Sequence, residues 1–210
     1  MTQKYQAILF DLLGALLDSW TVWDKTAGSE TMGRTWRAEY LRITRACGKY
    51  RPYLTLVAEA ARTVGLDPRL AQALEENWRD YKPWPDVRPV VGELARTHRL
   101  GVVTNCSETL GQAAAKHVGV PFDVVVTCER AGYYKPEPYP YQLALKEIGC
   151  PASRVLYVSG AAFDLIGCTA VGMDAYWHNR LGHARASDCL EPLVESRTLA
   201  QLPALALTPM

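Results

Sequence analysis

Short apolar runs recur along the chain, and turn-forming residues separate them. Five runs are rich in Val, Ile or Leu and do not alternate with polar residues; they cover residues 6–10, 99–104, 123–127, 154–159 and 174–177. Unbroken apolar character is typical of strands that are buried on both faces of a parallel sheet. Between the later runs, stretches with helical spacing cover residues 107–117, 139–148 and 163–171. This alternation predicts an α/β fold with a Rossmann-like core of five parallel strands.

The interval between the first two runs is far longer than a simple crossover requires. A crossover needs about a dozen residues or somewhat more, whereas residues 11–98 separate these two runs. Within the interval, helical spacing covers residues 29–46, 53–64 and 68–81, and three prolines between positions 83 and 89 stop the helices. We therefore predict a core of residues 1–18 and 83–210, with a helical cap of residues 19–82 inserted after the first strand.

Composition narrows the class of protein. With 49% hydrophobic and 21% charged residues, the 210-residue chain can bury a core, which excludes an intrinsically disordered protein. The formal net charge is +1 and like charges form no block, so nucleic acid is not an expected partner. No apolar run approaches the roughly 18 to 20 residues of a membrane helix, and the first residues lack the order of a signal peptide. We expect a cytoplasmic protein that does not bind membranes.

The cysteine pattern does not encode a metal site. The six cysteines form no CxxC pair, and no histidine stands at zinc-ligand spacing from them. In a chain without an export signal, free and largely buried thiols are the expected state. A nucleophilic role for Cys106 is disfavoured because no sequence motif brings a histidine beside it.

Chemically active side chains follow the predicted strands. Ligands of parallel α/β sheets bind beyond the carboxyl ends of the strands, so the residues directly after each apolar run are the candidates. The segments in question are Asp11-Leu-Leu-Gly-Ala-Leu-Leu-Asp18 after the first run, Thr104-Asn105-Cys106-Ser107 after the second, Lys135-Pro136 before the fourth and Ser159-Gly160-Ala161-Ala162-Phe163-Asp164 after it.

The order of these segments resembles the haloacid dehalogenase superfamily over nearly the whole chain. The first motif of that superfamily is a strand followed by Asp-x-x-Gly-x-Leu-x-Asp, which Asp11 begins here. The resemblance implies that Asp11 is a nucleophile, with Thr104, Lys135 and Asp164 as its hydroxyl, lysine and acid partners. Such a carboxylate forms a covalent ester that water then hydrolyses. An ammonium group keeps the carboxylate ionised, and Thr104 can donate a hydrogen bond to it.

Two positions separate the branches of this superfamily. Its phosphatases generally carry a second Asp two residues after the nucleophile and a Gly-Asp-x-x-x-Asp motif that holds Mg²⁺, but Leu13 and Gly160 occupy the two acidic positions here. Leu13 cannot protonate a leaving group, and the loss of a carboxylate weakens a Mg²⁺ site. The sequence therefore disfavours phosphate transfer and predicts no metal and no cofactor.

Further residues resemble the 2-haloacid dehalogenase branch, in which halide leaves without protonation. Trp36-Arg37 matches its Trp-Arg pair, Asn105 matches its amide beside the strand-two hydroxyl, and Tyr141 matches a Tyr six residues after the Lys. The resemblance implies that Arg37, Asn105 and Tyr141 bind the substrate or the leaving anion, while Ser159 and Asp164 position the hydrolytic water. The tail Trp177-His178-Asn179-Arg180 also resembles the Trp-x-Asn-Arg segment of this branch.

Two departures keep three functions open. The branch usually has Thr at Ala15 and Asn at Ala161, so either the substrate differs, the rate is low or another group substitutes. The first hypothesis is a metal-independent hydrolase that displaces a leaving group from a small carboxylate, most simply halide from an (S)-2-haloacid. The second is a Mg²⁺-dependent phosphatase acting on a small phosphorylated metabolite. The third is a binding protein with impaired catalysis. The resemblance also allows a homodimer, because cap helices in this branch often meet across subunits.

Overall fold

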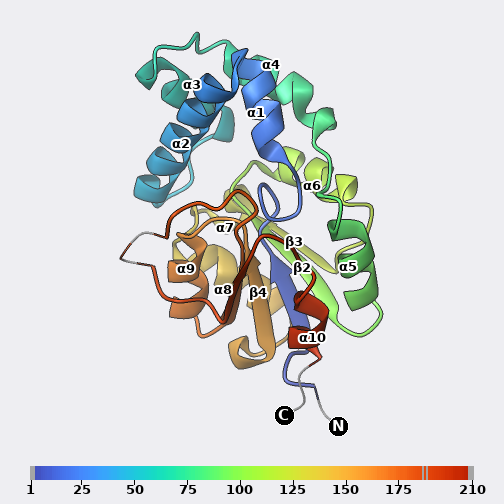
Figure 1. Ribbon diagram of the computed structural model, residues 1–210. Helices are drawn as coiled ribbons and strands as arrows, with labels where there is room; N and C mark the ends of the chain where they lie inside the picture. Colours follow the sequence, from blue (N-terminus) through green and yellow to red (C-terminus); the bar gives the residue numbers. More distant parts are fainter. Residues whose placement is uncertain (1–2, 186, 188, 208–210) are drawn as a thin grey trace.

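The computed structural model describes residues 3–185, 187 and 189–207, and these form an α/β fold around one parallel sheet (Figure 1). The strand order is β3-β2-β1-β4-β5-β6. The strands are β1 (Ala7–Phe10), β2 (Arg99–Thr104), β3 (Val124–Thr127), β4 (Val155–Ser159), β5 (Asp174–His178) and β6 (Val194–Ser196). The predicted fold class is confirmed, but the prediction of five strands was wrong. The sixth strand has three residues and none of them is buried, so it leaves no apolar run in the sequence.

Both faces of the sheet are buried, which explains the unbroken apolar runs. In β1, Ile8 and Phe10 point into one core layer, while Ala7 and Leu9 point into the other, as the alternation of side chains along a strand requires. Helices cover both layers: α5 (Val87–Leu94), α6 (Glu108–His117), α7 (Cys128–Ala131), α8 (Pro138–Ile148), η2 (Ala152–Arg154), α9 (Asp164–Ala170) and α10 (Leu202–Ala206).

A group of helices stands over the carboxyl edge of the sheet, at the top of Figure 1. It comprises α1 (Ser19–Ala27), α2 (Glu30–Cys47), α3 (Tyr53–Thr63), α4 (Leu70–Glu76) and η1 (Asn77–Asp80). Aromatic rings form its interior; for example, the ring centroids of Trp23 and Trp36 are 4.6 Å apart. The helix α1, which the sequence analysis did not predict, begins where the Asp18 carboxylate accepts a hydrogen bond from the Thr21 amide at 3.1 Å.

Two linkers join this group to the sheet, and they run beside each other. The Asp18 amide donates to the Lys82 carbonyl at 2.8 Å, and the Trp84 amide donates to the Leu16 carbonyl at 3.0 Å. We propose that these linkers bound a cap of residues 19–82. The prolines that follow end η1 but do not exclude a helix, since α5 contains Pro89. That residue lies in the first turn, where a backbone amide has no partner within the helix.

Candidate active site

The carboxyl ends of the central strands meet in a cavity of about 320 Å³ beneath the cap. Parallel pairing aligns Phe10 with Val102 and with Val158, so the residues that follow β1, β2 and β4 lie at one edge of the sheet. Five of the predicted site residues line the cavity: Asp11, Arg37, Thr104, Asn105 and Lys135. The other three do not line it and are fully or almost fully buried: Tyr141, Ser159 and Asp164.

The ammonium group of Lys135 lies at the centre of the polar cluster. Its Nζ is 2.8 Å from Asp11 Oδ1, 3.1 Å from Asp164 Oδ2 and 3.1 Å from the Tyr157 hydroxyl. Burial alone would lower the pKa of Lys135, but the negative charges of Asp11 and Asp164 outweigh it and raise the pKa above its ordinary value. Lys135 is therefore charged, and it holds Asp11 in a fixed orientation.

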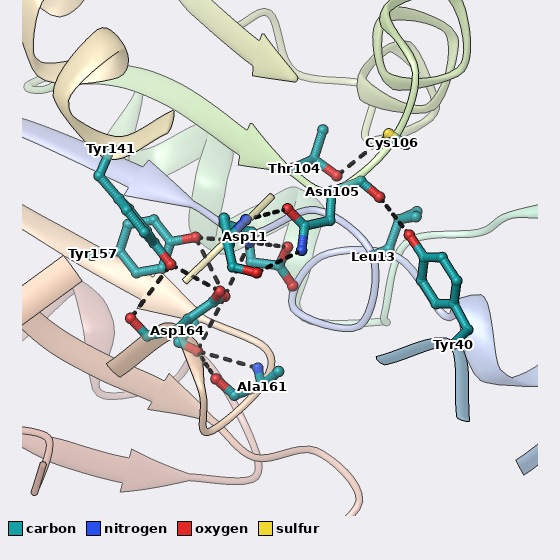
Figure 2. Close-up of polar contacts among 12 residues, drawn as sticks. Asp11, Leu13, Tyr40, Thr104, Asn105, Cys106, Tyr141, Tyr157, Ala161 and Asp164 are labelled. Atoms are coloured by element: carbon teal, nitrogen blue, oxygen red, sulfur yellow. Dashed lines mark hydrogen bonds and ion pairs between the residues drawn. The ribbon is translucent and has the colours of Figure 1, made fainter. Parts of the chain in front are cut away.

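Asp164 faces the interior behind Lys135, where hydroxyl groups surround it. Figure 2 shows Tyr141 and Tyr157 converging on its carboxylate. The Tyr141 hydroxyl lies 3.0 Å from Oδ1, while the hydroxyls of Tyr157 and Ser159 each lie 3.4 Å from Oδ2. Burial raises the pKa of Asp164 to about 6, although the charge of Lys135 opposes this effect.

This geometry changes the expected roles of three residues. Tyr141 was expected to touch the substrate, but it is fully buried and contacts Asp164 instead. Ser159 and Asp164 were expected to position water, yet neither reaches the cavity surface; the Ser159 hydroxyl donates to the Ala161 carbonyl at 2.5 Å. We propose that all three are positioning residues that act through Lys135.

Asn105 fixes the main chain of Lys135. Its Oδ1 accepts from the Lys135 amide at 2.8 Å, and its Nδ2 donates to the Lys135 carbonyl at 3.2 Å. The carbonyl of Asn105 in turn accepts a hydrogen bond from the Tyr40 hydroxyl of helix α2 at 2.9 Å, as Figure 2 shows. The predicted anion ligand is thus also a connection between the cap and the lysine.

Thr104 lines the cavity, but in the described part of the chain no hydrogen bond joins it to Asp11. Its hydroxyl lies 3.5 Å from the Cys106 sulfur. The Cys106 thiol is fully buried, and burial raises its pKa to about 12. A thiol in this environment stays protonated, which agrees with a packing role for Cys106.

Arg37 brings a positive charge from the cap to the cavity. Helix α2 carries it, its Nη2 donates to the Leu13 carbonyl at 3.0 Å, and its Nη1 donates to the Ser19 hydroxyl. The guanidinium lies 4.2 Å from the centroid of the Trp20 ring. No carboxylate forms an ion pair with it among the described residues. Its partners are neutral, so its positive charge is available to an anion in the cavity.

The loops after β1 and β4 pack too closely to admit a side chain at Gly160. A β-carbon built there would lie 2.4 Å from the Ala15 amide nitrogen and 2.8 Å from Asp11 Oδ2. His178 Nδ1 contacts the Ala15 carbonyl at 2.7 Å and supports the same loop from strand β5. Leu13 and Ala161 line the cavity, so the site has an apolar wall on both sides of Asp11.

Sequence analysis missed Tyr157, which contacts both Lys135 and Asp164. The one signal for it was a hydroxyl-bearing side chain at the third position of a fully buried strand. His178 had been noted only as part of a motif. Its contact with the nucleophile loop spans 163 residues of sequence, and no local pattern predicts a contact of that range.

Comparison with known proteins gives a consistent result. A family model described as haloacid dehalogenase-like hydrolase matches residues 5–172. Haloacetate dehalogenase H-2 of Moraxella sp. (strain B) is 28% identical over 199 residues, which cover 87% of this chain and 89% of the relative. The (S)-2-haloacid dehalogenase of Xanthobacter autotrophicus is 27% identical over 183 residues, or 80% of this chain and 72% of the relative.

Solved structures show the same fold. A crystal structure of an L-2-haloacid dehalogenase superposes with a TM-score of 0.86 at 25% identity, covering 98% of this chain and 100% of the other. The L-2-haloacid dehalogenase of Xanthobacter autotrophicus with chloropropionic acid covalently bound gives a TM-score of 0.85 at 22% identity, covering 96% and 98% of the two chains. No helix in the described ranges is long and apolar enough to cross a membrane.

Proposed function

Since this chain belongs to the haloacid dehalogenase-like hydrolase family, we propose that it is an (S)-2-haloacid dehalogenase acting on a small carboxylate. The relatives' names supply the substrate class, and the cavity supports it. Asp11 provides a buried carboxylate, and Arg37 provides a cation on the opposite, cap side of the same cavity. A small molecule with a carboxylate and an electrophilic carbon needs both groups.

In the proposed first step, an Asp11 oxygen attacks the carbon that bears the halogen. The carbon–oxygen bond forms while the carbon–halogen bond breaks, and halide leaves with the bonding electron pair. Lys135 keeps Asp11 ionised before the attack, and Arg37 stabilises the substrate carboxylate or the departing halide. Neither residue transfers a proton in this step, because a halide needs none to leave.

In the second step, water adds to the carboxyl carbon of the Asp11 ester and the bond from that carbon to the substrate oxygen breaks. One proton of the water goes to the released product oxygen and the other to solvent, which restores Asp11 as a carboxylate. Esterification removes the charge of Asp11, but Lys135 keeps its contacts with Asp164 and Tyr157, 3.1 Å away in each case. The ammonium therefore stays in place and can stabilise the negative oxygen that forms when water adds to the ester. In this proposal Ser159, Tyr141 and Asp164 contribute by holding Lys135.

The close packing at Gly160 is the observation that favours halide over phosphate as the leaving group. A carboxylate for Mg²⁺ at this position would need a β-carbon 2.4 Å from the Ala15 nitrogen, a distance that atoms do not tolerate. Leu13 offers no acid to protonate an alkoxide leaving group. We therefore propose a metal-independent reaction.

One assay tests the function. Purified protein is given (S)-2-chloropropionate or a panel of phosphomonoesters, with Mg²⁺ or with EDTA, and the release of chloride and phosphate is measured. We expect chloride release that EDTA does not change. Phosphate release that depends on Mg²⁺ would replace this function with the phosphatase, and the absence of both activities would favour a binding protein.

A further inference from the structure

Two buried polar atoms on the cap side of the cavity have no hydrogen-bond partner among the described residues. They are the hydroxyl oxygen of Tyr53 and Nε of Arg37. Both residues line the cavity. Buried donors are rarely left unpaired, because each costs about 1–3 kcal/mol of lost solvation. With the indole nitrogen of Trp177, which also lines the cavity, they make three unpartnered donors at one cavity, and this indicates that an acceptor completes the site when a ligand is bound.

Tyr53 is held rigidly in its position. It begins helix α3 and is 2% exposed. Its ring lies edge-on to that of Tyr40, with centroids 5.4 Å apart, and edge-on to that of Trp78 at 5.6 Å. Since aromatic neighbours fix the ring, its hydroxyl cannot turn out to bulk water to find a partner. This fixed geometry is what a binding residue requires.

The chemistry of the two groups specifies the ligand. A guanidinium Nε can only donate, and burial raises the pKa of Tyr53 well above its ordinary value, so its hydroxyl stays protonated. Two donors, one of them cationic, match a small anion. We propose that Tyr53 is a binding residue whose hydroxyl donates a hydrogen bond to the anion held by Arg37. The identity of that anion, the substrate carboxylate or the departing halide, rests on the proposed function.

The contact transfers no proton. As the Asp11–carbon bond forms and the carbon–halogen bond breaks, halide leaves with the electron pair, and the Tyr53 hydroxyl keeps its hydrogen throughout. If Tyr53 contacts the halide, its contribution grows as charge develops on the leaving atom and is larger for compact fluoride and chloride than for bromide. If it contacts the carboxylate, its contribution is the same for every halogen.

The test compares Tyr53→Phe with Tyr81→Phe. Tyr81 is a stringent control because it is equally buried, its hydroxyl is also unpartnered and it is also an electrostatic neighbour of Arg37, but it does not line the cavity. Sodium chloride, sodium bromide and sodium propionate are titrated into the resting protein. Binding is followed by tryptophan fluorescence, since the rings of Trp20 and Trp23 lie 4.2 Å and 6.0 Å from the Arg37 guanidinium.

We expect Tyr53→Phe to weaken binding of at least one of these anions about tenfold to a hundredfold, as expected for a hydrogen bond to a charged group, and Tyr81→Phe to leave it unchanged. The anion affected identifies the contact. Equal affinity in wild type and Tyr53→Phe, or equal losses in both variants, would overturn the proposal. Binding is measured without turnover, so the result stands apart from the assay of the proposed function. Matching melting temperatures for the two variants confirm that both are folded.

A kinetic comparison then adds a second readout if the protein releases halide. The ratio of kcat/KM for wild type to kcat/KM for Tyr53→Phe is measured with 2-fluoro-, 2-chloro- and 2-bromopropionate. A ratio that rises from bromide to fluoride assigns the hydrogen bond to the leaving group, whereas a constant ratio above one assigns it to the carboxylate. A ratio of one for all three substrates would contradict a role for the hydroxyl.

Discussion

At the residue scale, the site depends on how one buried ammonium is shared between two carboxylates. Lys135 is 1% exposed, and it balances Asp11 and Asp164 at contact distance. A buried ion pair of this kind adds little to the free energy of unfolding, but removing one of its partners is strongly destabilising. The arrangement therefore serves chemistry more than folding, since it presents an ionised, oriented Asp11 to the cavity.

The proposed nucleophile is tested by Asp11→Asn. An amide is a poor nucleophile, so turnover should fall on the order of 10⁴-fold or more. The similar volume of Asn, together with the remaining ion pair between Lys135 and Asp164, preserves the fold. Steady-state kinetics measure the fall and circular dichroism checks the fold. In ¹⁸O-labelled water under single-turnover conditions, wild-type protein should carry label in Asp11. Label in the product of the first turnover would show that water attacks the substrate directly.

Tyr157→Phe separates positioning from binding. The ring remains, but Lys135 loses the hydroxyl at 3.1 Å. Because Tyr157 does not line the cavity, we expect kcat to fall about tenfold, the cost of roughly one hydrogen bond to a charged group, with KM unchanged. Tyr141→Phe is the matched control, since Tyr141 contacts Asp164 and not Lys135; its loss of kcat should be smaller. A rise in KM alone for Tyr157→Phe would assign the residue to substrate binding.

The sequence predicted the residues around Lys135 better than their contacts. Motif order placed Asp11, Lys135 and Asp164 together because each follows or precedes a strand of one parallel sheet. The direction of a side chain after a strand depends on loop packing that spacing does not encode. For that reason Asp164 and Tyr141 were expected at the cavity, whereas Asp164 points toward the interior and meets the Tyr141 hydroxyl of α8 there.

At the element scale, the cap depends on the close crossing of α1 and α2. A β-carbon built at Gly33 of α2 would lie 2.4 Å from the Asp24 Cα of α1. The two backbones therefore approach as closely as a glycine permits, and this brings Trp23 against Trp36. Arg37 lies one turn after Gly33 on α2, so its position at the cavity depends on the crossing of α1 and α2.

Gly33→Ala should push these helices apart. Overpacking of this kind costs about 1–3 kcal/mol, and we expect a lower free energy of unfolding in urea together with a reduced kcat/KM, because Arg37 moves with α2. Gly92→Ala is a suitable control: nothing lies within 4 Å of a β-carbon at that helical position, and alanine favours a helix over glycine. Equal stability of Gly33→Ala and wild type would mean that the helices adjust without strain.

Elements were predicted where hydrophobic patterns were long, and missed where they were short. Strands β1 to β5 and the longer helices follow directly from the hydrophobic patterns. Helix α1 has nine residues with only three buried, and β6 has three residues, so neither carries enough positions to establish a period. Helix α5 was obscured for another reason, namely that Pro89 suggests a break although its place in the first turn permits a helix.

At the scale of the whole molecule, buried histidines couple stability to pH. Burial lowers the pKa of His98 and of His178. A folded-state pKa below the unfolded value of about 6.5 means that acid protonates the unfolded chain first, so stability is lost as pH falls through this range. Asp164 acts in the opposite direction, because its raised pKa, about 6, favours the protonated folded state as the pH falls from 6 toward 4.

His178→Asn isolates one of these contributions. His178 is fully buried, and an Asn amide can still donate to the Ala15 carbonyl that His178 Nδ1 contacts. We expect wild type to lose more free energy of unfolding than the variant between about pH 8 and about pH 5.5, as measured by urea denaturation. Asp164 is common to both proteins, so its effect cancels. Parallel pH dependences would show that protonating His178 has no cost in the folded state.

The paired linkers have a consequence for how such a molecule can be rebuilt. Leu17 and Pro83 form an antiparallel bridge, and the adjoining Asp18 amide is hydrogen-bonded to the Lys82 carbonyl. The chain thus leaves the sheet and returns to it at almost the same point, as the two arms of a hairpin do. A tight turn could replace everything between these arms, because adjacent antiparallel arms need only two connecting residues. We therefore expect that caps from related proteins can be grafted at this point without a break in the strands beneath.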